Sequence, residues 1–144
     1  MNFQECIQFA NENPLCYFAT VDGDQPHVRA LLMWYADETG FYFATMTPKR
    51  FWEQMENNPK VELCFYNNAA EMMAGTMMRV TGSVELLRDE GLNAKVVKER
   101  AFLEDLAGQP IGPVTEAFRV SSGKAVFWTM NDVLKERDLV WLEF

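Results

Sequence analysis

A period of two in the hydrophobic pattern runs through much of this 144-residue chain. Residues 41–46 read Phe-Tyr-Phe-Ala-Thr-Met and residues 61–66 read Val-Glu-Leu-Cys-Phe-Tyr, so two sets of side chains alternate along each segment. Such alternation, in segments rich in aromatic and β-branched residues, is typical of β-strands. The strands predicted in this way cover residues 15–21, 27–35, 41–46, 61–66, 72–87, 117–120 and 124–130.

Turn residues connect most of these strands. Asp22-Gly23-Asp24 and residues 37–40 are typical of hairpin turns. Ser121-Ser122-Gly123 is predicted to form the turn of a terminal hairpin. Gly75 and Gly82, inside the long strand, are predicted to mark bulges or bends.

A spacing of three and four residues between apolar positions predicts three helices. The first covers residues 2–13. The second begins at Pro48, with Thr47 as its N-cap, and ends before Pro59. The third covers residues 89–107.

These elements predict a mainly β fold with helices at its margin. Six or seven short strands, most of them joined by hairpins, favour a closed antiparallel barrel. The chain shows no alternation of strands with helices and no Gly-x-Gly-x-x-Gly motif. It also lacks internal repeats and linker-like segments, so residues 1–144 are expected to form a single domain.

Charge and composition exclude several classes of partner. The formal net charge is −8, which argues against a nucleic acid. No apolar run approaches the ~20 residues of a membrane span, and residues 1–5 lack the basic start of a secretory signal. The three cysteines have no metal-ligand spacing and are expected to be reduced thiols in the cytoplasm.

Two cations occupy the start of the predicted second helix. Lys49 and Arg50 lie at the end of a helix whose dipole favours negative charge. Together with free backbone N–H groups and the hydroxyls of Thr45 and Thr47, they would suit a phosphate. The alternative is a pair of solvated surface cations.

Arg29 and His27 are two further candidates in the second strand. Arg29 lies between apolar neighbours, where an unpaired charge is costly, which favours a phosphate or carboxylate partner. His27, the only histidine, is either a plain edge residue or a proton relay. No Ser-His-Asp set can be built from one histidine, so no catalytic residue is identified and a cofactor would have to supply any chemistry.

The order of these pieces along residues 15–130 resembles the FMN-binding split-barrel family typified by pyridoxamine 5′-phosphate oxidase. Within that family it is similar to the small single-domain branch that includes nitroimidazole-reductase-like proteins. The segments that carry the resemblance are, in chain order, HVRALLMW, FATMTPKR, VELCFYN, MRVTGSVELL and AVFWTM.

The resemblance implies a six-stranded antiparallel split β-barrel of Greek-key type, flanked by helices and paired into a homodimer. Two FMN molecules would lie across the interface. The phosphate would be held by Lys49 and Arg50, with Arg29 nearby. The residues implied to bind FMN are Arg29, Ala30, Leu31, Leu32, Thr45, Thr47, Lys49 and Arg50 of one protomer, with Met77 and Trp128 from the other.

The implied function is that of an oxidoreductase that passes electrons from a reduced nicotinamide through FMN to a small flat acceptor. The chain lacks the C-terminal arginines with which the true oxidase holds pyridoxine phosphate, so that activity is not expected. Two alternatives stay open. One is a non-catalytic flavin carrier or sensor, and the other is a split barrel that binds heme or a deazaflavin.

Overall fold

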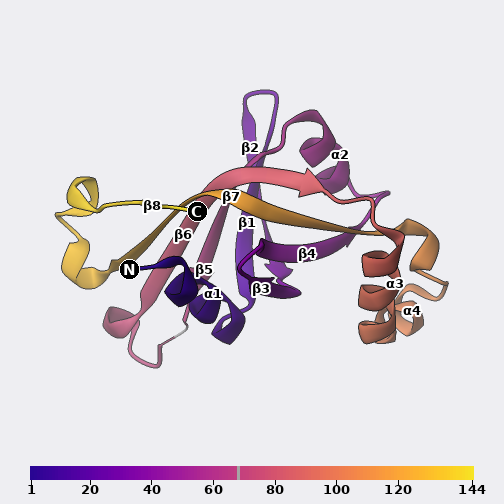
Figure 1. Ribbon diagram of the computed structural model, residues 1–144, viewed down its shortest axis with the longest axis horizontal. Helices are drawn as coiled ribbons and strands as arrows, with labels where there is room; N and C mark the ends of the chain where they lie inside the picture. Colours follow the sequence, from indigo (N-terminus) through magenta and orange to yellow (C-terminus); the bar gives the residue numbers. More distant parts are fainter. Residues whose placement is uncertain (68) are drawn as a thin grey trace.

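One antiparallel sheet of eight strands dominates the computed structural model, which describes residues 1–67 and 69–144, with Met72 described by its backbone alone (Figure 1). The strand order is β2-β1-β5-β6-β7-β4-β3, and β8 pairs with β7 outside this path. The mainly β antiparallel fold that the sequence predicts is confirmed, whereas the number of six strands is wrong. The strands are β1 (Leu15–Asp22), β2 (Gln25–Leu32), β3 (Tyr35–Asp37), β4 (Gly40–Met46), β5 (Lys60–Tyr66), β6 (Thr76–Leu86), β7 (Thr115–Thr129) and β8 (Leu142–Glu143).

The sheet is curled like a barrel. Its two ends in the pairing order, β2 and β3, are separated along the chain by only Met33 and Trp34, so the sheet must bend until these ends approach each other. Aromatic rings fill the inside of the curl. The ring centroid of Phe18 on β1 lies 5.2 Å from that of Phe43 on β4 and 5.9 Å from that of Phe118 on β7. Contacts between strands that are distant in the order are those of a barrel core.

The strand predicted over residues 27–35 is interrupted in the structure. The N–H of Met33 donates to the carbonyl oxygen of Pro14 at 2.8 Å, and the N–H of Trp34 donates to that of Tyr42 at 2.8 Å. The backbone therefore leaves the β1 side of the sheet and joins β4, where it continues as the short strand β3.

Strand β7 runs without interruption through Ser121-Ser122-Gly123, so the predicted terminal hairpin is wrong. Ser121 and Ser122 lie opposite Ser83 at a β-bulge, where the register of β7 against β6 shifts between Gly82 and Val84. Gly123 pairs with Gly82, and a Cβ on Gly123 would lie 2.0 Å from the carbonyl oxygen of Thr81. Close approach of the two backbones therefore accounts for both glycines, and the irregularity predicted at Gly82 is confirmed.

The helices lie outside the curled sheet. The helix predicted from Pro48 with Thr47 as its N-cap begins instead at Arg50 with Lys49 as its N-cap, because the backbone of Lys49 is still extended (φ −72°, ψ 143°). The helix predicted over residues 89–107 is two helices. The α-helices are α1 (Phe3–Glu12), α2 (Arg50–Asn57), α3 (Glu90–Glu99) and α4 (Phe102–Ala107), and the 3-10 helices are η1 (Met72–Ala74), η2 (Gly112–Val114), η3 (Met130–Asp132) and η4 (Glu136–Asp138).

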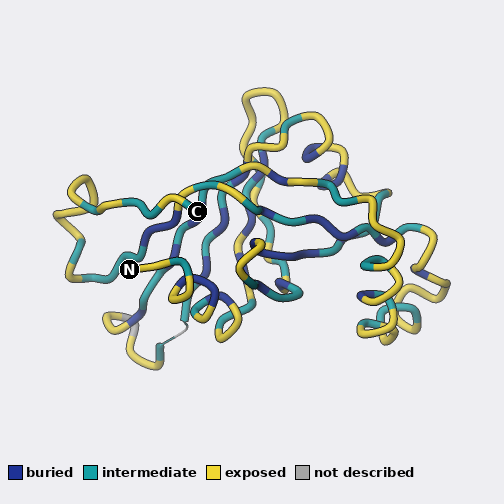
Figure 2. The backbone as a smooth tube through the Cα atoms, in the orientation of Figure 1, coloured by how far each residue is buried: buried dark blue, intermediate teal, exposed yellow. Residues whose placement is uncertain are grey.

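Helices α3 and α4 lie at one end of the molecule, and the segment from η3 to β8 lies at the other (Figure 1). Buried residues are concentrated on the strands between these ends (Figure 2). Among the described residues, no helix is both long enough and apolar enough to cross a membrane.

Candidate functional site

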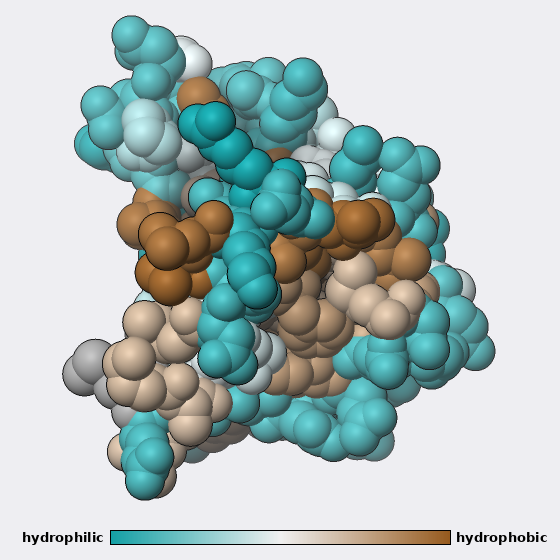
Figure 3. All heavy atoms as spheres, turned by 90° about the vertical axis from the view of Figure 1, so that its left-hand side faces the viewer, coloured by the Kyte–Doolittle hydropathy of each residue, from teal (hydrophilic) through white to brown (hydrophobic). Residues whose placement is uncertain are grey.

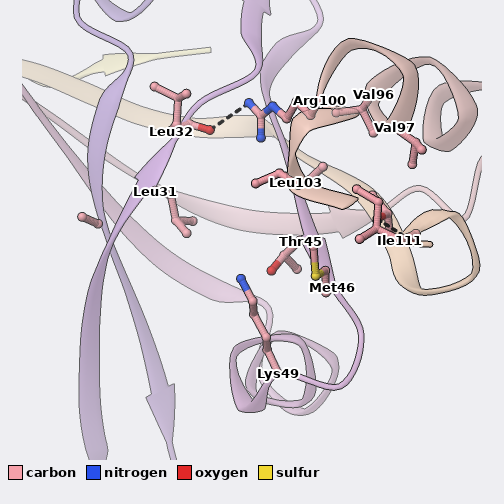
Figure 4. A pocket seen from close by; sticks show the side chains of 13 residues that line it. Leu31, Leu32, Thr45, Met46, Lys49, Val96, Val97, Arg100, Leu103 and Ile111 are labelled. Atoms are coloured by element: carbon pink, nitrogen blue, oxygen red, sulfur yellow. Dashed lines mark hydrogen bonds between the residues drawn. The ribbon is translucent and has the colours of Figure 1, made fainter. Parts of the chain in front are cut away.

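A groove follows the free edge of β2, in the gap between the two ends of the curled sheet. In the described part of the chain β2 pairs with β1 alone. Its other edge faces β4, the start of α2, and helices α3 and α4 (Figure 4). Backbone groups on a free edge are not used by a ladder and are available to a ligand. We call this feature the β2 groove; it consists of two adjoining pockets that share Ala30, Leu31 and Lys49.

The first part of the groove, the cationic pocket, is lined by Arg29 from β2 and by Lys49 and Arg50 from the start of α2. None of these three makes an ion pair with a carboxylate within the described residues. The structure therefore brings together the three cations that the sequence suggests for a phosphate. The other residues that line the pocket are Asp22, His27, Ala30, Leu31, Phe51 and Gln54.

Neutral groups hold the side chain of Arg29. Its Nη1 donates to Oγ1 of Thr20 at 2.8 Å, and its Nη2 donates to Oε1 of Gln54 at 2.8 Å. The guanidinium carbon lies 4.4 Å from the centre of the Phe51 ring. Partial burial lowers the pKa of Arg29 from its ordinary value, and no acid in the described chain offsets its charge. The sequence leaves either a phosphate or a carboxylate as the partner of Arg29. The described residues pair no carboxylate with it.

The second part of the groove, the apolar pocket, has a volume of about 180 Å³. The side chains of Leu31, Leu103 and Lys49 converge on it from three elements (Figure 4). Thr45 on β4 is 5% exposed, and its Oγ1 has no hydrogen-bond partner in the described part of the chain. The lining residues are Ala30, Leu31, Leu32, Ala44, Thr45, Met46, Lys49, Val96, Val97, Arg100, Leu103, Ile111 and Thr115.

Three of the residues that the resemblance assigns to FMN lie outside this groove. Thr47 belongs to the turn before α2 and does not line either pocket. Met77 and Trp128 pair across β6 and β7 and line a separate pocket with Trp141. Strands β1 and β5 stand between β2 and β6, which at ~4.8 Å per strand separates Met77 from β2 by roughly 14 Å. The resemblance assigns these two residues to the site of a second protomer, and within one chain they do not line the β2 groove.

Arg100 is a groove residue that the sequence does not indicate, because the helical pattern places it on the outer face. It lies in the break between α3 and α4, where its Nη2 donates to the carbonyl oxygen of Leu32 at 3.2 Å. Burial lowers its pKa from the ordinary value. Neither glycine nor proline marks this break, so the sequence carries no signal for it.

Gln54 and Thr20 are also missed by the sequence patterns. Both are buried, at 8% and 1% exposure. Gln54 lies on the same inward face of α2 as Phe51 and Met55, so a polar residue on an apolar helix face is the available signal. A buried amide needs partners, and here its oxygen accepts hydrogen bonds from Arg29 and Thr20.

Comparisons with solved structures give the same fold at low sequence identity. A NimC/NimA family protein from Clostridium acetobutylicum matches with a TM-score of 0.73 and 20% identity, over 98% of this chain and 92% of that one. An FAD-binding protein from Mesorhizobium loti matches with a TM-score of 0.71 and 20% identity, over 88% of this chain and 94% of that one. HutZ, a heme storage protein from Vibrio cholerae, matches with a TM-score of 0.64 and 16% identity, over 90% of this chain and 95% of that one.

Comparison with curated proteins gives no match. The sequence does match a family model, described as pyridoxamine 5′-phosphate oxidase, over residues 3–129. This range includes every strand from β1 to β7 and all residues of the β2 groove. The chain therefore belongs to the pyridoxamine 5′-phosphate oxidase family.

Proposed function

We propose that this protein binds FMN in the β2 groove and acts as a homodimeric oxidoreductase. The observation that carries the proposal is the meeting of Arg29, Lys49 and Arg50 in one pocket, with no carboxylate paired to them in the described chain. A phosphate dianion would supply the missing negative charge through charge-assisted hydrogen bonds. Membership of the family, and the likeness in fold to an FAD-binding protein, support a flavin as the carrier of that phosphate.

The rest of the groove fits the flavin ring. Isoalloxazine has apolar faces and polar edges, and a site for it needs apolar side chains beside a few hydrogen-bonding groups. The apolar pocket offers Leu31, Leu103 and Ile111, while the free edge of β2 offers backbone groups. The buried hydroxyl of Thr45 lacks a partner and would gain one from a polar edge of the ligand.

In the proposed reaction the side chains of the groove bind, orient and shield the reactants. When bound, FMN supplies the redox chemistry, taking a hydride from a reduced nicotinamide and passing electrons to a small flat acceptor. The polar side chains that line the apolar pocket are Thr45, Lys49, Arg100 and Thr115, and we assign none of them a catalytic role.

The outer face of the sheet supports a homodimer. Tyr17 pairs with Ala30 on one side and with Cys64 on the other, so the three side chains share a face. Tyr17 is 46% exposed there, and Val28 and Leu32 on the same face of β2 are 70% and 54% exposed. Large apolar side chains gathered on one face mark an interaction surface. The apolar pocket, at about 180 Å³, is also smaller than the ~300 Å³ of an ordinary ligand pocket, so a partner would complete its wall.

A second apolar surface lies at the end of the molecule that carries η3, η4 and β8. Apolar side chains gather on this face (Figure 3). In the segment between β7 and β8, Val133, Leu134 and Val140 are exposed by 59%, 93% and 81%. The pocket of Met77 and Trp128 adjoins this segment, which supports the proposal that these two residues meet the groove of a partner.

We place the protein in the cytoplasm. Cys6, Cys16 and Cys64 are all free in the structure. Unpaired cysteines are ordinary in a reducing compartment, whereas disulfides predominate in secreted proteins.

A non-catalytic flavin carrier or sensor is the second candidate. It is favoured by the lining of the apolar pocket, which among the described residues includes no histidine or carboxylate to transfer a proton. Purified protein that holds FMN but shows no oxidation of NADH or NADPH over a panel of quinone and nitroaromatic acceptors would support this candidate over the oxidoreductase.

A third candidate replaces FMN with heme or a deazaflavin. The likeness in fold to a heme storage protein motivates it, together with the place of His27 in the cationic pocket. Flavin, deazaflavin and heme have distinct visible absorption bands, so a spectrum of the protein after addition of each ligand separates the three.

The test of FMN binding is a fluorescence titration of purified protein with FMN and with riboflavin, which lacks the phosphate. We expect micromolar or tighter binding of FMN. The double substitution Lys49→Glu/Arg50→Glu should abolish it, because the cationic pocket would repel the dianion. The matched control is Lys60→Glu/Lys98→Glu, which makes the same change in net charge at two exposed lysines outside the groove. FMN affinity that is equal in both double variants would contradict the proposal.

A further inference from the structure

His27, the only histidine, lies in the cationic pocket. It is half-buried on β2, where it pairs with Thr20, and it stands two residues before Arg29 on the same face of the strand. It does not line the apolar pocket, where the flavin ring is proposed to lie. The position of His27 therefore does not support a proton relay to the flavin ring. It does support a contact with the phosphate.

The charges around His27 come from three elements. Asp22 lies at the end of β1, Arg29 on β2, and Lys49 and Arg50 at the start of α2. The pocket therefore holds three cations and one carboxylate beside the imidazole. A bound dianion offsets the positive charge and favours a proton on the imidazole. Proton binding and phosphate binding are then coupled, and the coupling is reciprocal.

We propose that His27 is a fourth ligand of the phosphate in the cationic pocket and that its protonated form tightens the binding of FMN at acidic pH. This inference rests on the proposed function. It adds a residue that neither the resemblance nor the pattern of cations assigns to the cofactor, and it gives FMN affinity a dependence on pH that Arg29, Lys49 and Arg50 alone would not produce.

The experiment compares wild-type protein with His27→Gln by titration with FMN at pH 5.5 and at pH 8. Protonation of free FMN is common to both titrations and cancels in the ratio of the two dissociation constants. We expect His27→Gln to bind FMN about threefold to tenfold more weakly at pH 5.5, and to match wild type within about 1.5-fold at pH 8. Riboflavin should give a ratio near one at both values of pH. Inorganic phosphate should compete better against FMN at pH 5.5 in wild type than in the variant.

A second variant, His27→Lys, tests the inference independently in case glutamine disturbs the strand. His27→Lys carries its charge at both values of pH, so it should bind FMN more tightly than wild type at pH 8. The matched control is Lys60→Gln, which removes one positive charge outside the groove and should leave FMN affinity unchanged. If wild type binds FMN but the ratio of the dissociation constants of His27→Gln and wild type is the same at both values of pH, the inference is overturned and the proposed function still stands. No binding of FMN at either pH would overturn both.

Discussion

The guanidinium of Arg29 donates from Nη2 to Oε1 of Gln54 at 2.8 Å, and this contact joins β2 to α2. The same oxygen accepts from Oγ1 of Thr20 at 2.7 Å, and that hydroxyl in turn accepts from Nη1 of Arg29 at 2.8 Å. The three side chains close a ring of hydrogen bonds in which Arg29 is the only charged member. Neutral partners fix the direction of the guanidinium without offsetting its charge, and the charge stays available to an anion in the cationic pocket.

Gln54→Glu should weaken FMN binding without weakening riboflavin binding. A carboxylate at this position would pair with Arg29 and offset the charge that the phosphate needs. We expect a loss of about tenfold in FMN affinity, or about 1.4 kcal/mol, measured by fluorescence titration at pH 8. Glu53→Gln, at an exposed position of the same helix, is the control and should bind FMN as wild type does. Equal affinities of Gln54→Glu and wild type would show that the charge of Arg29 is not used.

Thr45→Val should stabilise the cofactor-free protein and weaken its hold on FMN. The hydroxyl of Thr45 is buried without a partner, so its removal should raise the free energy of unfolding by about 1 kcal/mol. The same hydroxyl is proposed to donate to the cofactor, so FMN affinity should fall severalfold. Urea denaturation of the cofactor-free protein and FMN titration measure the two effects.

Thr20→Val is the matched control for that substitution. Its hydroxyl donates to Gln54 and accepts from Arg29, so valine would remove both hydrogen bonds. Oε1 of Gln54 would keep only the bond from Nη2 of Arg29, and Nη1 of Arg29 only the 3.3 Å bond to the carbonyl oxygen of Phe18. We expect a loss of stability of about 1–3 kcal/mol. If Thr45→Val destabilises the cofactor-free protein as much as Thr20→Val does, the hydroxyl of Thr45 already has a hydrogen-bond partner within the protein. It would then not be free to bind the cofactor.

The positions of most strands follow from the sequence because a period of two, bounded by turn residues, is a local signal. The error at Ser121-Ser122-Gly123 has a different origin. Two serines and a glycine are typical of a turn, but here they sit inside β7 because Gly82 on β6 requires a partner without a side chain. That requirement is a contact between residues 41 positions apart, and no local pattern contains it. The same holds for residues 33–34, whose break depends on pairing with β4.

Gly123→Ala should be strongly destabilising because the backbones of β6 and β7 approach closely at this bulge. A Cβ at Gly123 would meet the carbonyl oxygen of Thr81, a backbone atom that cannot turn aside. We expect a loss of about 2–4 kcal/mol in the free energy of unfolding. Gly112→Ala is the control, since a Cβ there would meet nothing within 4 Å, and it should change stability by less than about 1 kcal/mol. Equal denaturation midpoints for the two variants would rule out the close approach of the two backbones.

The cationic pocket could be anticipated and the walls of the groove could not. Lys49 and Arg50 stand out because they lie at the wrong end of a helix dipole, and Arg29 because it lies among apolar residues. Both signals are local. Arg100 and Leu103 line the groove because a helix breaks at a point that no glycine or proline marks. The separation of Met77 and Trp128 from the groove depends on strand order, which the sequence does not give.

Tyr17→Lys should convert a dimer into a monomer. Tyr17 lies in the centre of the apolar outer face, between Ala30 and Cys64, and a lysine there would place a charge in the proposed interface. We expect wild type to sediment as a dimer and the variant to sediment as a folded monomer with weaker FMN binding. Gln4→Lys, at an exposed position of α1 outside both apolar surfaces, is the control and should stay dimeric. A monomeric wild-type protein that binds FMN would contradict the composite site.

Cys6 should make the protein less stable at alkaline pH. Burial raises the pKa of its thiol from 9.0 to about 11, so in the unfolded chain the thiol ionises first. Between these two values the unfolded state binds fewer protons than the folded state, and the free energy of unfolding therefore falls as pH rises. The contribution is fully present below about pH 9 and is lost by about pH 11; a difference of about two in pKa corresponds to roughly 3 kcal/mol.

Cys6→Ala tests this directly, because alanine is small, apolar and does not titrate. Urea denaturation of both proteins under reducing conditions, at pH 8 and at pH 10.5, gives the change in stability for each. We expect wild type to lose more stability than Cys6→Ala over this interval, since ionisation of lysines and tyrosines is common to the two and cancels. An equal alkaline loss in both would mean that the thiol is reached by water or that α1 frays before the barrel unfolds, and the packing of α1 against the core would then have to be revised.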